Sequence, residues 1–454
     1  MSESTIYIHA PSNEPLSREQ KRSVWGWAFY DWAESAFSTS ILVAVLPIYY
    51  LSIAPSGPIT FHLGPWQITT AATSLWAYTV GLSTLIIAVP SPVLGAIADS
   101  SGRRKWFLGF FAYTGALFSA LLICVGHGQY LLASVIFLVA NAASVGGTIF
   151  YNSLLLDIAP PGRIDSVSGK GFALGYAGGG ILLVVNLLMV SQPKWFGIPS
   201  AEWGARLSFL TVGLWWAVFT IPTLLLVRER RIAAERPSGG YIRLGIRRTV
   251  STLRHALRYR DLVVFIVAFL IYNDGIQTVI VMAVPYGKEV LGLGAGTLMG
   301  VIVLIQVIGV PGSLLFGAVA ERWGAKRAVI SALVIWSVVV VYAWRMQHPA
   351  EFWVLGVLVG FVLGGSQAIS RSLYGAMIPV GHNAEFYGFL AVSSRFASFL
   401  GPIAFGLARD LTGSMRAAII ALVAFFLVGL VVLTAVNVER GMREAGRTPA
   451  SNSE

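Results

Sequence analysis

One short turn occurs twice in this chain, and it limits what the chain can fold into. The segment Gly95-Ala-Ile-Ala-Asp99-Ser-Ser-Gly102-Arg103-Arg104-Lys105 returns 222 positions later as Gly317-Ala-Val-Ala-Glu321-Arg-Trp-Gly324-Ala-Lys326-Arg327. Each copy lies between two long apolar runs, and its second glycine permits a turn backbone that other residues resist. A buried strand cannot hold such a basic turn. The sequence therefore predicts two loops on one face of a membrane and a duplicated architecture.

The composition indicates a membrane protein. Hydrophobic residues make up 56% of the 454 residues and charged residues only 12%, with a mean hydropathy of +0.72; soluble domains have about 25% charged residues. The net charge of +11 does not indicate nucleic-acid binding, because the cations cluster in loops. Cys124 is the one cysteine, so a disulfide framework and a cysteine metal site are excluded, and we expect no cofactor and no metal. Residues 1–24 contain no apolar stretch typical of a cleaved signal peptide.

Apolar runs of about 20 residues, each long enough to cross the hydrocarbon core, recur along the whole chain. They predict an all-α polytopic membrane protein with 12 spans, at residues 25–51, 70–98, 106–126, 130–158, 169–191, 207–227, 262–286, 297–320, 328–345, 352–379, 386–411 and 416–438. The predicted domains are an N-tail (1–24), a six-helix bundle (25–227), a linker (228–261), a second six-helix bundle (262–438) and a C-tail (439–454).

The linker is strongly basic and predicts the orientation. It contains ten arginines and is interrupted by Pro237-Ser-Gly-Gly240, after which a basic helix could lie on anionic lipid. Most other loop cations fall on the same side as the linker. By the positive-inside rule, we expect both termini and the linker in the cytoplasm of a cell-membrane protein. The segment 52–68 is predicted to be an outer loop without chemistry.

Polar residues inside the spans are expensive, at about 2.5–3.5 kcal/mol for a charge on insertion scales, so they mark partners or functional sites. The candidates lie on the first, fourth, seventh and tenth predicted spans: Asp31, Glu34, Asn141, Asn152, Tyr272, Asn273, Asp274, Gln277, Gln367 and Arg371. Lys170 and Arg395 add cations on the fifth and eleventh. We expect Arg371 and Arg395 to face Asp274 across one cavity. The alternative for each residue is a structural salt bridge or a position at the lipid headgroups.

The two repeated turns are predicted to act as gating loops at the cytoplasmic face. Asp99 is expected to accept hydrogen bonds from the turn or from a neighbouring helix N-terminus, where negative charge is favoured. Asp157 is expected to join Arg103 or Arg104 in the same cluster. The candidate gating residues are Gly95, Asp99, Gly102, Arg103, Arg104, Asp157, Gly317, Glu321, Gly324, Lys326 and Arg327.

The paired turns and the two six-span halves resemble the major facilitator superfamily. Within it, the octet Tyr30-Asp-Trp-Ala-Glu-Ser-Ala-Phe37 is similar to the first-helix signature of the vacuole-effluxer branch, whose fungal members are associated with release of amino acids from the vacuole. Tyr151-Asn-Ser-Leu154 and Tyr272-Asn-Asp-Gly275 fit as well. The chain departs from the branch at Glu34, where we expect Asn, and at Arg395, where we expect Lys. The short linker favours a prokaryotic member.

The resemblance implies that the first, fourth, seventh and tenth helices line a cavity between the halves. We therefore expect a monomeric secondary transporter of a small polar or zwitterionic solute, amino-acid-like, in proton-coupled efflux. Carboxylates would bind protons or an amine, and arginines would bind a carboxylate. A lipid or lysolipid flippase, a scramblase or a transport-inactive receptor of the same fold remains an alternative. An intramembrane enzyme is disfavoured, because the chain has no His-Glu-x-x-His or Gly-x-Ser-x-Gly motif, and the absence of a Walker lysine argues against ATP.

Overall fold

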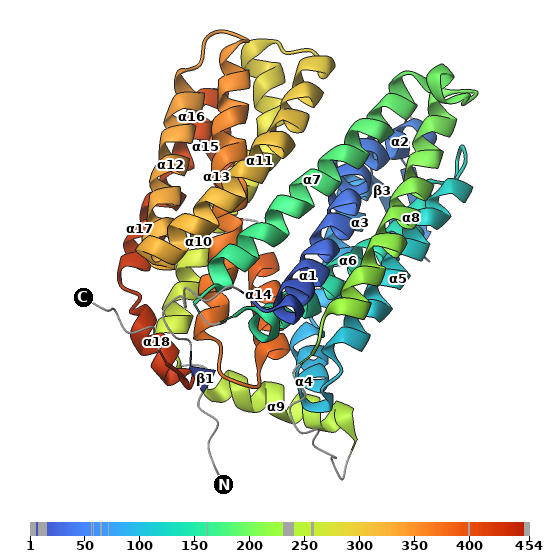
Figure 1. The fold of residues 1–454 in the computed structure, drawn as a ribbon. Helices are drawn as coiled ribbons and strands as arrows, with labels where there is room; N and C mark the ends of the chain where they lie inside the picture. Colours follow the sequence, from blue (N-terminus) through green and yellow to red (C-terminus); the bar gives the residue numbers. More distant parts are fainter. Residues whose placement is uncertain are drawn as a thin grey trace.

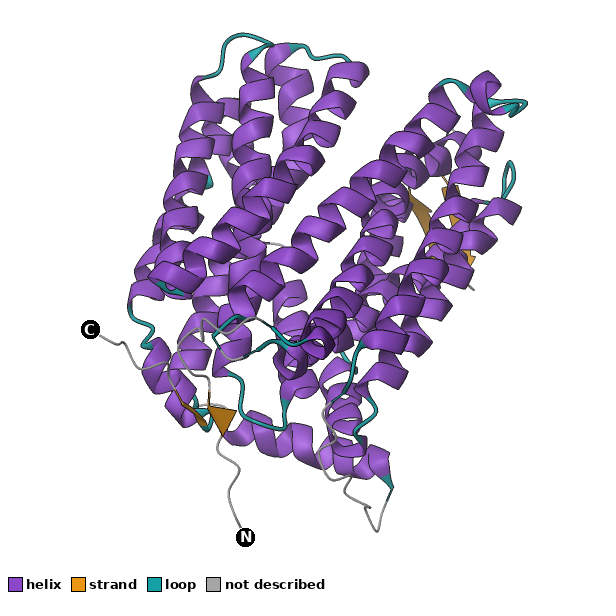
Figure 2. Cartoon of the chain, viewed as in Figure 1, coloured by secondary structure: helices purple, strands orange, loops and turns teal. Residues whose placement is uncertain are grey.

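Two helical bundles converge at one end of the molecule and diverge at the other (Figures 1 and 2). Within the described part of the chain, 11 helices or joined helices are long and apolar enough to span a membrane. The predicted span 386–411 is occupied by two helices with residues 398–399 between them. The computed structural model describes residues 6–7, 16–55, 57, 59–63, 66–70, 72–160, 162–229, 240–255, 258–397 and 400–448.

The helices of the N-terminal half follow the predicted order. They are α1 (Arg18–Ala36), the π-helix η1 (Phe37–Val45), α2 (Leu46–Ile53), α3 (Ala72–Ala88), α4 (Ser91–Ser101), α5 (Arg104–Leu121), η2 (Leu122–Cys124), α6 (Tyr130–Ile158), α7 (Ile164–Ser191), η3 (Pro193–Phe196) and α8 (Ala201–Leu226). The C-terminal half contains α10 (Arg260–Leu291), α11 (Ala295–Trp323), α12 (Ala325–Arg345), α13 (Glu351–Met377), α14 (Asn383–Ala397), α15 (Leu400–Thr412), α16 (Met415–Ala421) and α17 (Val423–Thr434).

Local chemistry explains where the first two spans differ from the prediction. Helix α1 starts at Arg18, ahead of the predicted residue 25, because Ser17 and Gln20 form a reciprocal capping box. The second span bends between α3 and α4 at Val89-Pro90, where proline disrupts the helical hydrogen bonds.

Four short strands supplement the helices in the described part of the chain. The predicted outer loop 52–68 contains an antiparallel hairpin of β2 (Ile59–Leu63) and β3 (Trp66–Thr70), with Phe61 opposite Ile68. Aromatic and β-branched residues alternate there, which suits a strand better than an irregular loop. The segment predicted as an outer loop therefore carries strand structure, which the sequence analysis did not specify.

The described helix of the linker and both ends of the described chain lie where the bundles converge. Helix α9 (Tyr241–His255), in the segment predicted to form a basic helix, lies across this end, which we call the α9 end (Figure 1). Strands β1 (Ile6–Tyr7) and β4 (Arg447–Thr448) pair in parallel there, next to α18 (Val438–Glu444). The buried Arg447 donates to the Ile378 carbonyl at 2.8 Å, and burial lowers its pKa to about 10. Both ends of the described chain therefore lie at one end, as an even number of spans requires.

Each half has its own hydrophobic core. In the N-terminal half Trp216 packs against Phe37, whose ring also stacks on Phe137. In the C-terminal half Trp336 stacks on Phe426 with ring centroids 5.8 Å apart. Because these cores belong almost entirely to one half, each half can move as a unit.

The halves meet at glycines near the α9 end, where α4 packs on α14 and α7 packs on α11. A Cβ atom on Gly95 would lie 2.3 Å from the Ala384 carbonyl oxygen, and one on Gly169 would lie 2.6 Å from the Ser313 carbonyl oxygen. Both neighbours are backbone atoms, which cannot rotate away. The closed arrangement at the α9 end therefore requires glycine at these positions.

This packing predicts that Gly95→Ala separates the halves at the α9 end. Overpacking against backbone costs about 1–3 kcal/mol, which is enough to change which arrangement is populated. Double electron–electron resonance between spin labels at Arg103 and His382, in a Cys124→Ser background, should show a longer distance. Gly81→Ala is the matched control, because a Cβ on Gly81 meets nothing within 4 Å in a helix of the same half. An unchanged distance in Gly95→Ala would contradict the close-packing argument.

Candidate functional site

The guanidinium of Arg371, on α13, projects from the C-terminal half into the N-terminal half. Its Nε donates to Ser168 Oγ at 2.9 Å and its NH2 donates to the Ser168 carbonyl at 2.8 Å. Its NH1 lies 3.4 Å from Asp31 Oδ2 and 3.3 Å from Asn152 Oδ1. These partners come from α1, α6 and α7. A single side chain thus joins three helices of the opposite half.

Three aromatic rings enclose the same guanidinium. Its central carbon lies 4.3 Å from the ring centre of Phe172, 4.9 Å from Trp27 and 5.4 Å from Tyr151, all within cation–π range. Trp27 and Tyr151 stack with centroids 4.3 Å apart, and the Tyr151 hydroxyl donates to Asp31 Oδ2 at 2.6 Å. We call this group the Arg371 site: Arg371, Asp31, Asn152, Ser168, Trp27, Tyr151 and Phe172.

The Arg371 site buries an ion pair, because Arg371 is only 8% exposed. Removing a charge from water is costly, and this cost is recovered only when the partners are well placed. Planar guanidinium suits this geometry, since its fixed fork can donate to several acceptors at once. The site therefore stabilises the closed α9 end only while both halves contribute to it.

A second carboxylate, Glu34, lies one helical turn further along α1 towards the diverging end. The Ser144 hydroxyl donates to it, and Ser144 itself is buried on α6. Glu34 is partly exposed, and within the described residues no cation lies within ion-pair distance of it. Glu34 thus differs from Asp31, whose charge is paired.

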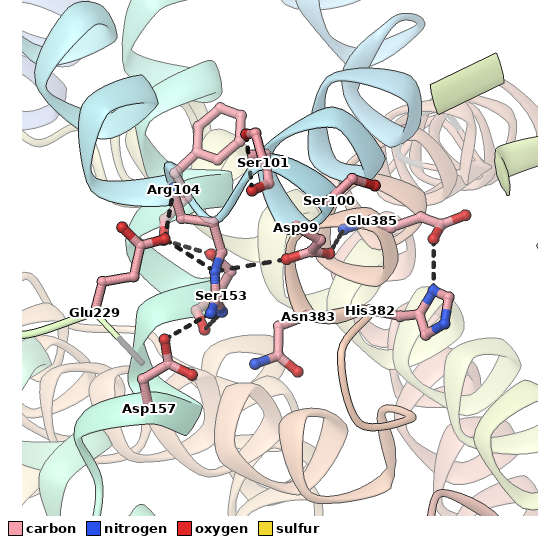
Figure 3. Close-up of polar contacts among 12 residues, drawn as sticks. Asp99, Ser100, Ser101, Arg104, Ser153, Asp157, Glu229, His382, Asn383 and Glu385 are labelled. Atoms are coloured by element: carbon pink, nitrogen blue, oxygen red, sulfur yellow. Dashed lines mark hydrogen bonds and ion pairs between the residues drawn. The ribbon is translucent and has the colours of Figure 1, made fainter. Parts of the chain in front are cut away.

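The first repeated turn contacts the other half through Asp99, which is buried (Figure 3). Its Oδ2 accepts from the backbone N–H of Glu385, in the first turn of α14, at 3.1 Å. Its Oδ1 lies 3.6 Å from Nε of Arg104. A carboxylate at a helix N-terminus receives both a hydrogen bond and the favourable end of the helix dipole.

Arg104 anchors this turn within its own half (Figure 3). Its NH2 lies 2.7 Å from Asp157, and its Nε lies 3.4 Å from Glu229, in the linker. Glu229 also accepts from the backbone N–H of Arg104 at 2.7 Å, at the start of α5. Asp157 is therefore adjacent to Arg104, and Arg103 is exposed outside this cluster.

The second repeated turn makes the equivalent contact between the halves, but it has no arginine at the position that corresponds to Arg104. Glu321 accepts from the backbone N–H of Ser166, in the first turn of α7, at 3.2 Å. Gly324 ends α11 and also precedes α12, whereas in the first turn these two positions are separate residues, Gly102 and Arg103. The second turn is one residue shorter, so Ala325 takes the place that Arg104 has in the first.

The lysines confirm this shift. Lys105 Nζ donates to the Val227 carbonyl, which follows the last residue of α8, at 2.9 Å. Lys326 Nζ donates to the Thr434 and Val436 carbonyls at the end of α17, at 2.8 and 2.7 Å. Lys326 thus corresponds to Lys105 in the structure. The sequence repeat, with its offset of 222 positions, had instead paired Lys326 with Arg104. Both lysines stay within their own half, and Arg327 is exposed.

Asp274 does not face Arg371, in contrast to the prediction. It is buried on α10, and its Oδ2 accepts from the backbone N–H of Gly401, on α15, at 2.6 Å. The carboxylate therefore joins α10 to α15 within the C-terminal half. The side chain of Arg395 lies outside the described residues.

Several other predicted residues lie apart from the Arg371 site. Asn141 donates to Ser83 Oγ on α3 at 2.7 Å, so it joins two helices of one half. The Tyr272 hydroxyl lies 2.6 Å from Ser370 Oγ, within the other half. Lys170 lines a separate pocket described below. Asn273, Gln277 and Gln367 are partly exposed and make no hydrogen bond to the described residues of the Arg371 site.

Five residues of these contacts were not among the predicted site residues: Trp27, Tyr151, Ser168, Phe172 and Glu229. Trp27 precedes Asp31 by one helical turn and Phe172 follows Ser168 by one, so helical periodicity alone placed each beside a site residue. No signal marked Glu229, because a lone acid in a basic linker is ordinarily solvated. Across the described residues, no group of three His, Cys, Asp or Glu side chains is arranged to hold a metal ion.

Known proteins resemble this chain over nearly its whole length. Residues 19–446 match the family described as vacuole effluxer Atg22 like. The MFS-type transporter YxiO of Bacillus subtilis is 34% identical over 414 residues, which are 90% of this chain and 94% of that protein. Autophagy-related protein 22 of Kluyveromyces lactis is 25% identical, with 96% of this chain and 98% of that protein covered.

Solved structures support the fold. FucP, a major facilitator superfamily transporter in the outward conformation, aligns with a TM-score of 0.66 at 14% identity, covering 92% of this chain and all of that one. The proton:xylose symporter XylE aligns with a TM-score of 0.64 at 14% identity, covering 92% and 95%. The relatives are transporters and not enzymes. The chain therefore belongs to the Atg22-like vacuole-effluxer family of major facilitator superfamily transporters, as a relative of its bacterial members.

Proposed function

We propose that this transporter exports a small zwitterionic, amino-acid-like solute in exchange for protons by alternating access. The observation that carries the proposal is the buried Arg371 guanidinium, which is held by the opposite half through Asp31 and Ser168. A movement that separates the halves at the α9 end breaks these bonds. It leaves an unpaired guanidinium next to an unpaired carboxylate, and a zwitterion satisfies both.

The proposed orientation places the α9 end in the cytoplasm. Helix α9 presents Ile242 and Ile246, 70% and 50% exposed, beside Arg243 and Arg247. An apolar stripe flanked by arginines suits the interface of an anionic leaflet. The conformation described here is then closed to the cytoplasm, with both halves latched by Asp99 and Glu321.

We assign proton binding to Glu34, with Asp274 as the second choice. Glu34 lacks a cation among the described residues, so an added proton removes a charge that the membrane interior disfavours. Asp31 is less suited, because its charge is needed by Arg371. Asp274 is also less suited, because its ionised form accepts a hydrogen bond from the backbone N–H of Gly401.

The first prediction concerns substrate binding. Arg371→Lys should weaken binding of an amino acid by roughly 10- to 100-fold, because Lys loses the two-point bond to a carboxylate, a loss of about 1.5–3 kcal/mol. The measurement is the ligand-induced rise in the unfolding temperature of purified protein, screened against amino acids, neutral sugars and lysolipids. Arg416→Lys, at the diverging end, is the control and should bind as the unmodified protein does.

A purely structural role for Arg371 has a different signature. If Arg371 only pairs with Asp31, Arg371→Gln combined with Asp31→Asn should restore transport, because both buried charges are removed together. Such a rescue would defeat the substrate role. A rise with lysolipid alone would instead favour a lipid substrate.

The second prediction concerns coupling. In proteoliposomes, Glu34→Gln should abolish uphill transport driven by a pH gradient while leaving exchange of solute for solute, because the site can no longer gain and lose a proton. Asp274→Asn is the comparison and should retain uphill transport if the protein folds. Loss of uphill transport in Asp274→Asn alone would transfer the proton role to Asp274. Full activity of both variants would exclude both residues.

The third prediction concerns the latch. Asp99→Asn should open the α9 end more than Glu321→Gln does, because Asp99 interacts with both a helix N-terminus and Arg104, whereas among the described residues Glu321 contacts only the N-terminus of α7. Leu156→Cys, at a cross-half contact with Gly375, reports opening through its rate of alkylation in inside-out vesicles of a Cys124→Ser background. Equal rates in the two variants and the parent would disprove the latch.

A further inference from the structure

A pocket outside the Arg371 site lies where the first turns of α1 and α7 meet at the α9 end. It has a volume of about 310 Å³ and is lined by Leu16, Lys21, Val24, Trp25, Arg163 and Lys170. Lys21 and Trp25 are one turn apart on α1. Arg163 directly precedes α7, and Lys170 lies on α7 two turns further on, so each helix directs one face at the pocket.

The pocket carries three positive charges and no acidic lining residue. Among the described residues, no carboxylate lies within 4.0 Å of the Lys21 or Lys170 ammonium. The nearest acid along α1, Glu19, pairs with Arg228 of the linker instead. The charges of Lys21 and Lys170, which no described carboxylate pairs with, therefore favour an anion with several acceptor oxygens.

The remaining lining of the pocket is apolar, and this favours an anion that also carries an apolar group. Trp25 is 52% exposed at the start of a membrane span, a position typical of the headgroup level. Val24 and Leu16 add aliphatic surface. A water molecule occupies about 30 Å³ of liquid, so the pocket is far larger than an inorganic phosphate needs. A phosphate attached to glycerol and the first carbons of acyl chains uses both the cations and the apolar wall.

We propose that this pocket is a binding site for the phosphate of an anionic glycerophospholipid in the leaflet that faces the α9 end. The lipid joins α1 to α7. Lys170 stands between Ser168 and Phe172, and Trp25 stands two residues before Trp27, so the bound lipid supports both helices that enclose Arg371. Binding of this lipid requires only the pocket, and it is independent of which solute is transported and of which residue binds a proton.

Thermal unfolding of the delipidated full-length protein in detergent tests the site. Dioleoyl-phosphatidylglycerol should raise the unfolding midpoint in a saturable way, whereas dioleoyl-phosphatidylcholine, glycerol 3-phosphate and inorganic phosphate should not. Lys21→Gln with Lys170→Gln should lower the affinity for phosphatidylglycerol about 30-fold, since each cation contributes about fivefold. Lys21→Gln alone, at an exposed position, should lower it about fivefold.

The matched control is Lys194→Gln with Lys288→Gln, which removes the same charge from exposed positions at the diverging end. It should bind phosphatidylglycerol as the parent does. Lys170→Arg keeps the charge and should retain binding. The proposal is overturned if the parent shows no saturable rise, if both double variants lose affinity equally, or if inorganic phosphate gives the same rise as the lipid.

Discussion

The closed end of this transporter depends on carboxylates that cap helices of the opposite half. Asp99 accepts from the first turn of α14, and Glu321 accepts from the first turn of α7. Near hydrocarbon, an uncapped N–H has no water to replace its partner, so each contact is needed while the end is closed. The stabilisation from each contact is nevertheless modest, since the interaction of a carboxylate with the helix dipole contributes about 0.3–1 kcal/mol. Contacts of this strength suit a joint that must open repeatedly, and the glycine at 95 lets the backbones come close enough to form one.

The two copies of the turn are unequal, and the inequality arises from one residue. In the first copy a glycine ends α4 and a separate residue precedes α5, which places Arg104 where it contacts Asp99, Asp157 and Glu229. In the second copy Gly324 both ends α11 and precedes α12. Ala325 therefore occupies the position that corresponds to Arg104. The N-terminal turn is consequently tied to the linker through Glu229.

The repeat and the hydropathy were enough to predict the fold, because both depend only on spacing along the chain. The helical stripes also placed Asp31, Asn152 and Arg371 among the candidates. The stripes could not show which of these residues contact one another. A stripe of polar residues gives the position along a helix and the face of that helix, but it does not show which neighbouring helix the face packs against. Asp274 shows the consequence: it is on a predicted cavity helix, yet it accepts from the backbone N–H of Gly401 on α15, a contact that no local pattern indicates. The one-residue difference between the turns was hidden because the sequence copies align without a gap.

In the proposed cycle, Arg371 has two roles that exclude each other. While the α9 end is closed, its guanidinium is bound to Asp31, Asn152 and Ser168, and a substrate carboxylate would have to displace them. When the halves separate there, the same guanidinium is released together with Asp31. A zwitterion then binds more tightly from the α9 side than from the other side. Because linkage is reciprocal, a ligand that prefers the α9-open state also favours opening of that end. The direction of the preferred transport step then depends on the side from which Arg371 is exposed. In the empty transporter Asp31 pairs with Arg371 and holds the α9 end closed. Asp31 therefore competes with the substrate carboxylate for Arg371, and this competition lowers the apparent affinity for the substrate.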